Sequence, residues 1–122
     1  MLTEQQKKYL IAIYLLGQNG GSVRITDIAG YLHVAKASVV KMVKKLIEEE
    51  LISKEPYHQI RLTQKGVTEA NGLFTPCIIL QDFFINQVGI SSQKAGQASM
   101  MISSALDEET LERIVSYVLS HG

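Results

Sequence analysis

The most constraining feature of this chain is the order of the patterns between Arg24 and Arg61. A short helical pattern, a tight turn at residues 33–35, a second helix with a lysine-bearing side and two short strands follow one another there. This order is typical of a winged helix-turn-helix, in which a turn joins two helices and a β-hairpin follows them. We therefore expect a mainly α chain with a winged helix-turn-helix in its first half.

The helices of the first half have readable starts. Thr3 is expected to cap a first helix, with Gln6 closing a capping box, and the helix should run to the glycines at 17–21. Thr26 is expected to cap the second helix, and Asp27 suits its positive N-terminal end. The third helix carries an apolar stripe at helical spacing, made of Val39, Met42, Val43, Leu46 and Ile47.

The predicted hairpin, or wing, has strands at 51–54 and 60–62 around the turn at 56–59. Thr63 should cap the next helix, which continues through 73–88 with a kink where Pro76 removes a backbone donor. A further helix opens at Ser91 or Ser92, and Asp107 caps the last one. Each of these two helices has an apolar stripe at helical spacing: Ala98, Met101, Ile102 and Ala105 on the first, and Leu111, Ile114, Val115, Val118 and Leu119 on the second.

Composition limits the function classes. The chain has 122 residues, 46% of them hydrophobic, which suits one compact body that a partner subunit could complete. The longest apolar run, at residues 9–16, is too short to cross a bilayer. Its single cysteine allows no internal disulfide, and no charged-then-apolar leader precedes Thr3, so we expect a cytoplasmic protein without a membrane role.

The charges are unevenly distributed although the net charge is zero. Residues 1–66 hold ten of the twelve Lys and Arg residues against six acids, a balance of +4, and residues 67–122 have the opposite balance of −4. A basic half binds polyanions better than the mean charge suggests.

The lysine-bearing helix fits the DNA major groove, where a helix reads base edges while lysines neutralise phosphates. We assign Ser38 and Lys41 to direct base contact, and Ala35 and Ala37 to steric fit or thymine-methyl contact. The remaining candidates contact phosphates or the minor groove: Lys36, Lys44 and Lys45 on the helix, and Lys54, His58 and Arg61 on the wing. Two alternatives remain: a solvated helix face, and a winged protein–protein interaction module without DNA binding.

Four motifs give the chain a resemblance to a known family. They are Tyr9-Leu10-x-x-Ile13-Tyr14, Thr26-Asp27-Ile28-Ala29-x-x-Leu32-x-Val34, Ala37-Ser38-Val39-x-Lys41-Met42-Val43-x-Lys45-Leu46 and Leu62-Thr63-x-x-Gly66. The chain resembles the diphtheria-toxin-repressor family, and most closely its manganese-responsive repressors. The resemblance implies a homodimeric transcription regulator of double-stranded DNA, with a DNA-binding domain at 1–66 and a helical dimerisation domain at 67–122.

The resemblance also implies a manganese or iron site, but the ligand positions have changed. They are occupied here by Lys8, Ile11, Cys77, Met100, Ser103 and Ser104, with Gln81 at an ancillary carboxylate position. Manganese and ferrous iron need carboxylate or imidazole donors, so we expect the usual metal site to be lost. Cys77 and Met100 are weaker candidates for a soft metal such as Cu(I), and core packing is the commoner role of such residues.

Two further interpretations concern Lys8 and catalysis. The Lys8 ammonium could occupy the space of the missing ion, or its side chain could simply extend to water, which we favour. The sequence shows no nucleophile beside a base, no paired carboxylates and no phosphate-binding glycine loop, so we do not expect an enzyme.

Overall fold

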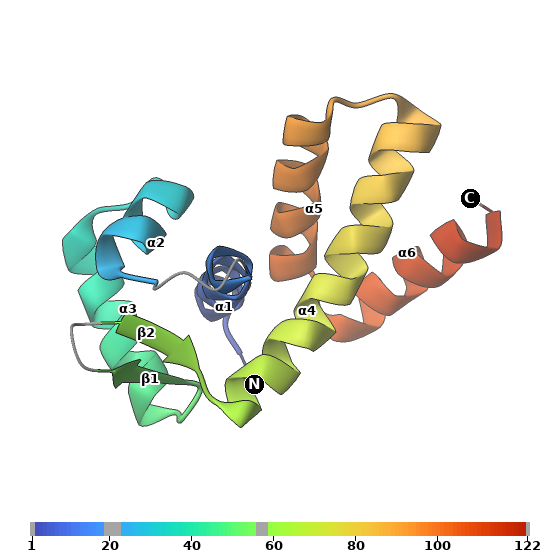
Figure 1. Cartoon of the computed structure of the whole chain (residues 1–122). Helices are drawn as coiled ribbons and strands as arrows, with labels where there is room; N and C mark the ends of the chain where they lie inside the picture. The colour runs from blue at the N-terminus through green and yellow to red at the C-terminus, as the bar shows by residue number, and fades with distance from the viewer. Residues whose placement is uncertain (1, 19–22, 56–58, 122) are drawn as a thin grey trace. The chain divides into compact units, whose positions relative to one another are not determined.

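The computed structural model describes residues 2–18, 23–55 and 59–121. Its elements (Figure 1) are α1 (Glu4–Gly17), α2 (Ile25–Leu32), α3 (Lys36–Glu48), β1 (Ile52–Glu55), β2 (Gln59–Leu62), α4 (Gln64–Phe83), the π-helical turn η2 (Phe84–Val88), α5 (Ser92–Ala105) and α6 (Glu108–His121). The chain divides inside α4 into an N-terminal unit, residues 1–70, and a C-terminal unit, residues 71–122. The mainly α fold with a winged helix-turn-helix is confirmed.

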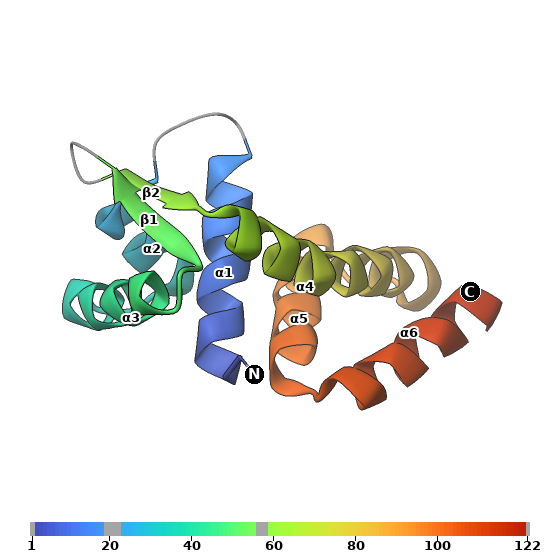
Figure 2. The ribbon, with the colours of Figure 1, turned by 90° about the horizontal axis from the view of Figure 1, so that it is seen from below.

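In the N-terminal unit, α1 packs against α2, α3 and β2, and α3 packs against α2 and β1. β1 and β2 pair antiparallel, from Ile52 opposite Leu62 to Glu55 opposite Gln59, and Figure 2 shows this hairpin from below. Val23 adds a single bridge, because its carbonyl accepts the Ile60 N–H at 2.7 Å. The hairpin is therefore attached to the helices through both of its strands.

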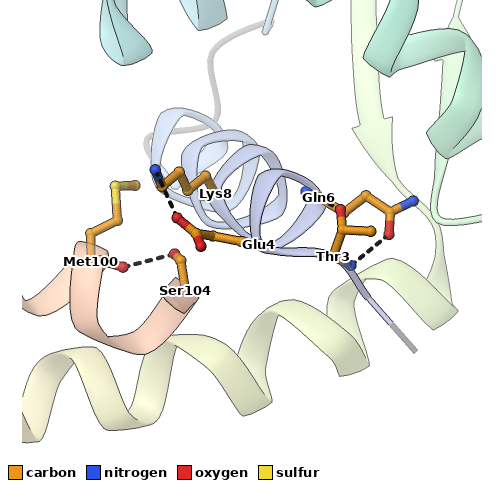
Figure 3. Close-up of polar contacts among 6 residues, drawn as sticks. All are labelled: Thr3, Glu4, Gln6, Lys8, Met100 and Ser104. Atoms are coloured by element: carbon orange, nitrogen blue, oxygen red, sulfur yellow. Dashed lines mark hydrogen bonds and ion pairs between the residues drawn. The ribbon is translucent and has the colours of Figure 1, made fainter. Parts of the chain in front are cut away.

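The first helix begins as the sequence predicts. Thr3 Oγ1 accepts the Gln6 N–H at 3.1 Å, and Gln6 Oε1 accepts the Thr3 N–H at 2.9 Å, which completes the capping box drawn in Figure 3. All residues at 9–13 are buried. Because a large apolar side chain contributes about 1.5–3 kcal/mol when fully buried, α1 is a main source of the unit's stability.

The second helix starts earlier than predicted. Arg24 is its N-cap, and the Arg24 N–H donates to Asp27 Oδ2 at 2.9 Å. The prediction that Thr26 caps this helix is wrong, because Asp27 lies three residues after Arg24 and satisfies the free backbone donor there. The helix ends at His33, whose φ of 57° is left-handed.

The wing agrees with the prediction to within a residue or two at each strand. Residues 56–58, and with them the candidate His58, lie outside the described residues. Thr63 caps α4 as expected, since its Oγ1 accepts the Gly66 N–H at 3.0 Å.

The C-terminal unit is built from the rest of α4, η2, α5 and α6. The helix α4 is continuous through Pro76, and α5 returns beside its second half in Figure 1. Ser91 caps α5 and Asp107 caps α6, as predicted. Hydrogen bonds from Thr110 lower the pKa of the Asp107 carboxyl, which is the expected effect of an N-cap. The small core combines Leu80, Leu111 and Val118 with Ile79, Phe83, Phe84, Ile102, Leu106 and Val115.

The apolar stripe on α5 is not the side of the helix that this unit buries, although Ile102 packs against the core. The buried side chains of this helix are Ala95, Ser99, Ser103 and Ser104, whereas Met101 is 62% exposed. Two of these serines satisfy their hydroxyls within the helix. Ser99 Oγ donates to the Ala95 carbonyl at 2.6 Å, and Ser104 Oγ donates to the Met100 carbonyl at 2.7 Å. A serine bonded in this way can pack like a small apolar residue.

On α6, the expected stripe is only partly buried: Leu111 and Val118 are buried, but Leu119 is 66% exposed. None of the described helices is long and apolar enough to cross a membrane.

Candidate nucleic-acid interface

The side of α3 singled out by the sequence is open to solvent. Every α3 candidate is exposed: Ala35, Lys36, Ala37, Ser38, Lys41, Lys44 and Lys45. The opposite side is held in the core by Val39, Val43 and Leu46, while Met42 is half-buried and Ile47 is 37% exposed, so the buried stripe is narrower than predicted. The structure thus presents the short side chains and the lysines together on one accessible helix face.

The lysines of this face are not engaged in ion pairs within the described part of the chain. The ion pairs found there are Lys8–Glu4 and Arg113–Glu109, and neither includes an α3 lysine. The first turn of α3 has no acidic residue, and no side chain caps its N-terminus at Ala35. Free N–H groups and the positive helix end add to the lysine charge, and both favour an anion such as phosphate.

The two described wing candidates lie on different faces of the hairpin. Lys54 is opposite Ile60 in the register, and Arg61 is opposite Ser53. Since side chains alternate along a strand, Lys54 and Arg61 point to opposite sides of the two-stranded sheet. Both are exposed, but the structure does not bring them together on one surface.

The metal-ligand positions of the N-terminal unit hold no donor suited to manganese or iron. Lys8 Nζ pairs with Glu4 Oε2 at 3.4 Å within α1, as Figure 3 shows, and its side chain is 28% exposed. Ile11 is 1% exposed and belongs to the core. A cation and an aliphatic side chain cannot coordinate a divalent metal ion.

The positions in the C-terminal unit hold weak donors in structural roles. Cys77 is buried, and its Sγ donates to the Ser99 carbonyl at 3.7 Å. Burial raises the pKa of the Cys77 thiol, opposed by a hydrogen bond from Ser103. That contact is weak, because the buried Ser103 Oγ has no hydrogen bond of normal geometry among the described residues. The Ser104 hydroxyl bonds to the carbonyl of Met100 in its own helix.

These residues do not fit manganese or ferrous iron, which prefer carboxylate and imidazole donors. Within the part of the chain that the structure describes, no group of three or more His, Cys, Asp or Glu side chains gathers at one place. Cys77 and Met100 are also poorly suited to a soft metal such as Cu(I), because the raised pKa of Cys77 disfavours the thiolate form that binds metal.

One contact near the interface was not predicted from the sequence. Gln6 Nε2 donates a hydrogen bond to Glu49 Oε2 at the C-cap of α3. The capping box explains a Gln at position 6 locally, so nothing in the sequence pointed to a partner 43 residues away. Only the burial of Gln6 indicates that its side chain needs a second partner, and this burial is seen in the structure and not in the sequence.

Comparisons with known proteins identify relatives among DNA-binding transcription regulators. Residues 1–60 match the family model described as "Iron dependent repressor, N-terminal DNA binding domain". The chain is 32% identical over 114 residues to the HTH-type transcriptional regulator MntR of Bacillus subtilis (strain 168), covering 93% of this chain and 80% of that protein. It is 29% identical over 114 residues to an uncharacterized HTH-type transcriptional regulator of Methanocaldococcus jannaschii, covering 93% of this chain and 91% of that protein.

A solved structure of the manganese regulator SloR shares the fold with a TM-score of 0.76 at 24% identity. The match covers 96% of this chain but 54% of that one, so the chain spans about half the length of this structural relative.

Proposed function

The chain belongs to the diphtheria-toxin-repressor family of metal-dependent transcription regulators, and from this premise we propose that it regulates transcription by binding double-stranded DNA as a homodimer, without the family's metal ion. In this proposal α3 reads the major groove and the wing contacts the DNA backbone. The protein acts in the cytoplasm and has no catalytic role.

One observation supports the proposal above the others: the exposed face of α3 carries four lysines that make no ion pair among the described residues. Unpaired lysines on a helix that is anchored by its other side can enter a groove without first losing an internal partner. Each phosphate that such a lysine neutralises releases condensed counterions, which favours binding. Ala37 and Ser38 have short side chains, so the first turn of α3 can approach the bases closely.

The homodimer is supported by apolar side chains that the C-terminal unit leaves exposed. Tyr117 and Leu119 on α6 are 64% and 66% exposed, and Met101 on α5 is 62% exposed. Large apolar side chains left exposed on a small unit are available to a protein–protein interface. A dimer would supply two α3 helices for two half-sites, which we expect to lie about one DNA helical turn, or a multiple of it, apart.

The loss of metal control is supported by the chemistry of the ligand positions. Lys8 already has an anionic partner in Glu4, and Cys77 and Ser104 donate to backbone carbonyls. In this proposal, contacts within the protein, and not a bound metal ion, hold α3 in the position that binds DNA.

The experiment is selection of DNA from a random duplex pool by the full chain in the presence of a chelator, followed by affinity measurements over a range of salt concentrations. We expect enrichment of a sequence with two related half-sites. Its affinity should fall steeply with salt, with a logarithmic slope of about −0.9 for each phosphate contact. Failure to bind any duplex at low salt would favour the alternative, a winged protein–protein interaction module.

A further inference from the structure

The side chain of Gln6 is a strongly buried polar group of α1, with 1% of its surface exposed. Both ends of its amide are used. Oε1 accepts the Thr3 N–H in the capping box, and Nε2 donates to the Glu49 carboxylate. In Figure 3 the amide extends on the side of α1 opposite to Lys8. Gln6 thus links the start of α1 to another helix of the same unit.

Glu49 lies at an electrostatically unfavourable place. It is the C-cap of α3, where the negative end of the helix repels a carboxylate. The amide of Gln6 offsets this by donating to the carboxylate, and Lys65 Nζ donates to the Glu49 carbonyl at 3.1 Å. The following residue, Glu50, has a left-handed φ of 61°, and its carbonyl accepts the Thr63 hydroxyl at 2.6 Å. The C-terminal end of α3 is therefore held from α1 and from the start of α4.

The rest of α3 is held by apolar contacts through Val39, Val43 and Leu46. Apolar burial is non-directional, so it tolerates small rotations and shifts of the helix. A hydrogen bond is directional and favours one arrangement of the two groups that it joins. At 1.5 Å per residue α3 is about 20 Å long, so a tilt of about 10° at its C-terminal end moves its N-terminal residues by roughly 3 Å. Such a shift would break hydrogen bonds to base edges.

We propose that Gln6 is a positioning residue for DNA recognition: its amide fixes the end of α3 through Glu49 and thereby sets how the face containing Ser38 and Lys41 meets the bases. The inference rests on the proposed function. It predicts that breaking the contact harms discrimination between DNA sequences more than it harms general attraction to DNA. Base contacts need accurate geometry, whereas phosphate contacts depend mainly on charge.

The test uses an exchange of donor and acceptor. Gln6→Glu keeps an oxygen for the Thr3 N–H, because a capping box accepts Glu as well as Gln, but it places a carboxylate against that of Glu49. The double variant Gln6→Glu/Glu49→Gln restores a donor and an acceptor in reverse order. Gln5→Glu is the matched control, since it makes the same charge change at an exposed neighbouring position of α1. Glu49→Ala tests the contact from its other side if Gln6→Glu does not fold.

Two probes are measured with each full-length variant: the duplex selected by the wild-type chain, and a random-sequence duplex of the same length. We expect Gln6→Glu to reduce the ratio of the two affinities by about tenfold, a loss on the scale of one broken base contact. The Gln5→Glu variant should leave the ratio within about twofold of wild type, and the double variant should recover most of it.

An equal loss on both probes, or no loss, would overturn the proposal, because a merely structural role lowers the folded fraction and affects both duplexes alike. A double variant as poor as Gln6→Glu would also overturn it. If the wild-type chain binds both duplexes but one of these outcomes is found, the role of Gln6 is rejected and the proposed function is retained. Absence of binding by the wild-type chain is the separate result that rejects both.

Discussion

Gly66 shows how a single residue can fix the junction between the wing and α4. A Cβ atom built at this position would lie 1.9 Å from the carbonyl oxygen of Leu51, far inside contact distance with backbone. That oxygen also accepts the Thr63 N–H at 3.1 Å, so it cannot move away without breaking the junction. The glycine in the Leu62-Thr63-x-x-Gly66 motif is therefore required by close backbone approach rather than by a special φ.

We expect Gly66→Ala to lower the free energy of unfolding by about 1–3 kcal/mol or more, the usual cost of forcing extra atoms into a packed site. Gly30→Ala is the control, because nothing lies within 4 Å of a Cβ atom there and α2 is helical. It should raise the free energy of unfolding by roughly 0.5–1 kcal/mol, as alanine favours a helix over glycine. Urea unfolding followed by circular dichroism measures both. Equal stability of Gly66→Ala and wild type would contradict the close approach of Gly66 to the Leu51 carbonyl.

Cys77 should behave as a structural thiol. Its pKa is raised by burial, so the folded state holds the thiol proton more tightly than the unfolded chain. The thiol's contribution to stability is accordingly complete at pH values below the pKa of the unfolded chain's thiol and is lost as the pH rises through the folded-state pKa.

Alkylation by iodoacetamide tests this role of Cys77. At about pH 8 the native chain should react at least tenfold more slowly than the urea-unfolded chain, because the thiolate is the reactive form. Equal rates would show that the thiol is accessible and ionised in the folded protein.

At the scale of elements, lysines on α3 should differ in whether they contact DNA phosphates or bases. Lys44→Ala should weaken binding of selected and random duplexes alike and reduce the salt slope by about 0.9, the value for one lost phosphate contact. Lys41→Ala should weaken the selected duplex more than the random one, because we assign Lys41 to the bases. Lys94→Ala removes an exposed lysine of the other unit and serves as the control. A change with Lys94→Ala as large as with Lys44→Ala would mean that binding follows net charge and not the face of α3.

The elements also show what the sequence could predict. The capping box of α1 and the caps of α4 and α6 were readable because each depends on residues three positions apart. The start of α2 was misplaced because Asp27 could act either inside a helix begun by Thr26 or as the acceptor for Arg24. The buried side of α5 could not be predicted from the sequence, because Ser99 and Ser104 satisfy their hydroxyls within the helix. Side-chain polarity alone cannot reveal that.

The candidate interface was readable to a similar extent. The exposure of the α3 lysines follows from the apolar stripe on the opposite side, a local pattern. The Gln6–Glu49 contact joins residues far apart in sequence, and no local pattern specifies it. The opposite orientation of Lys54 and Arg61 depends on strand register, which the wing sequence left open.

At the scale of the whole molecule, the exposed apolar surface of the C-terminal unit predicts association. We expect the wild-type chain to sediment as a dimer, and Tyr117→Glu to shift it toward the monomer, because a charge in an apolar interface must be desolvated without a partner. Ser120→Glu is the control, being a charge added at an exposed polar position of the same helix. Sedimentation equilibrium gives the masses. A wild-type monomer at all concentrations would reject the homodimer.

The decisive measurement is the affinity of the full chain for its selected duplex, first with a chelator present and then with added manganese or ferrous iron. Because Lys8, Ile11 and Cys77 offer no suitable donors, we predict tight binding in the chelator and less than about a twofold change on adding either metal. Binding that appears only when the metal is added would contradict a metal-free regulator, and absence of binding under every condition would contradict recognition of DNA by α3.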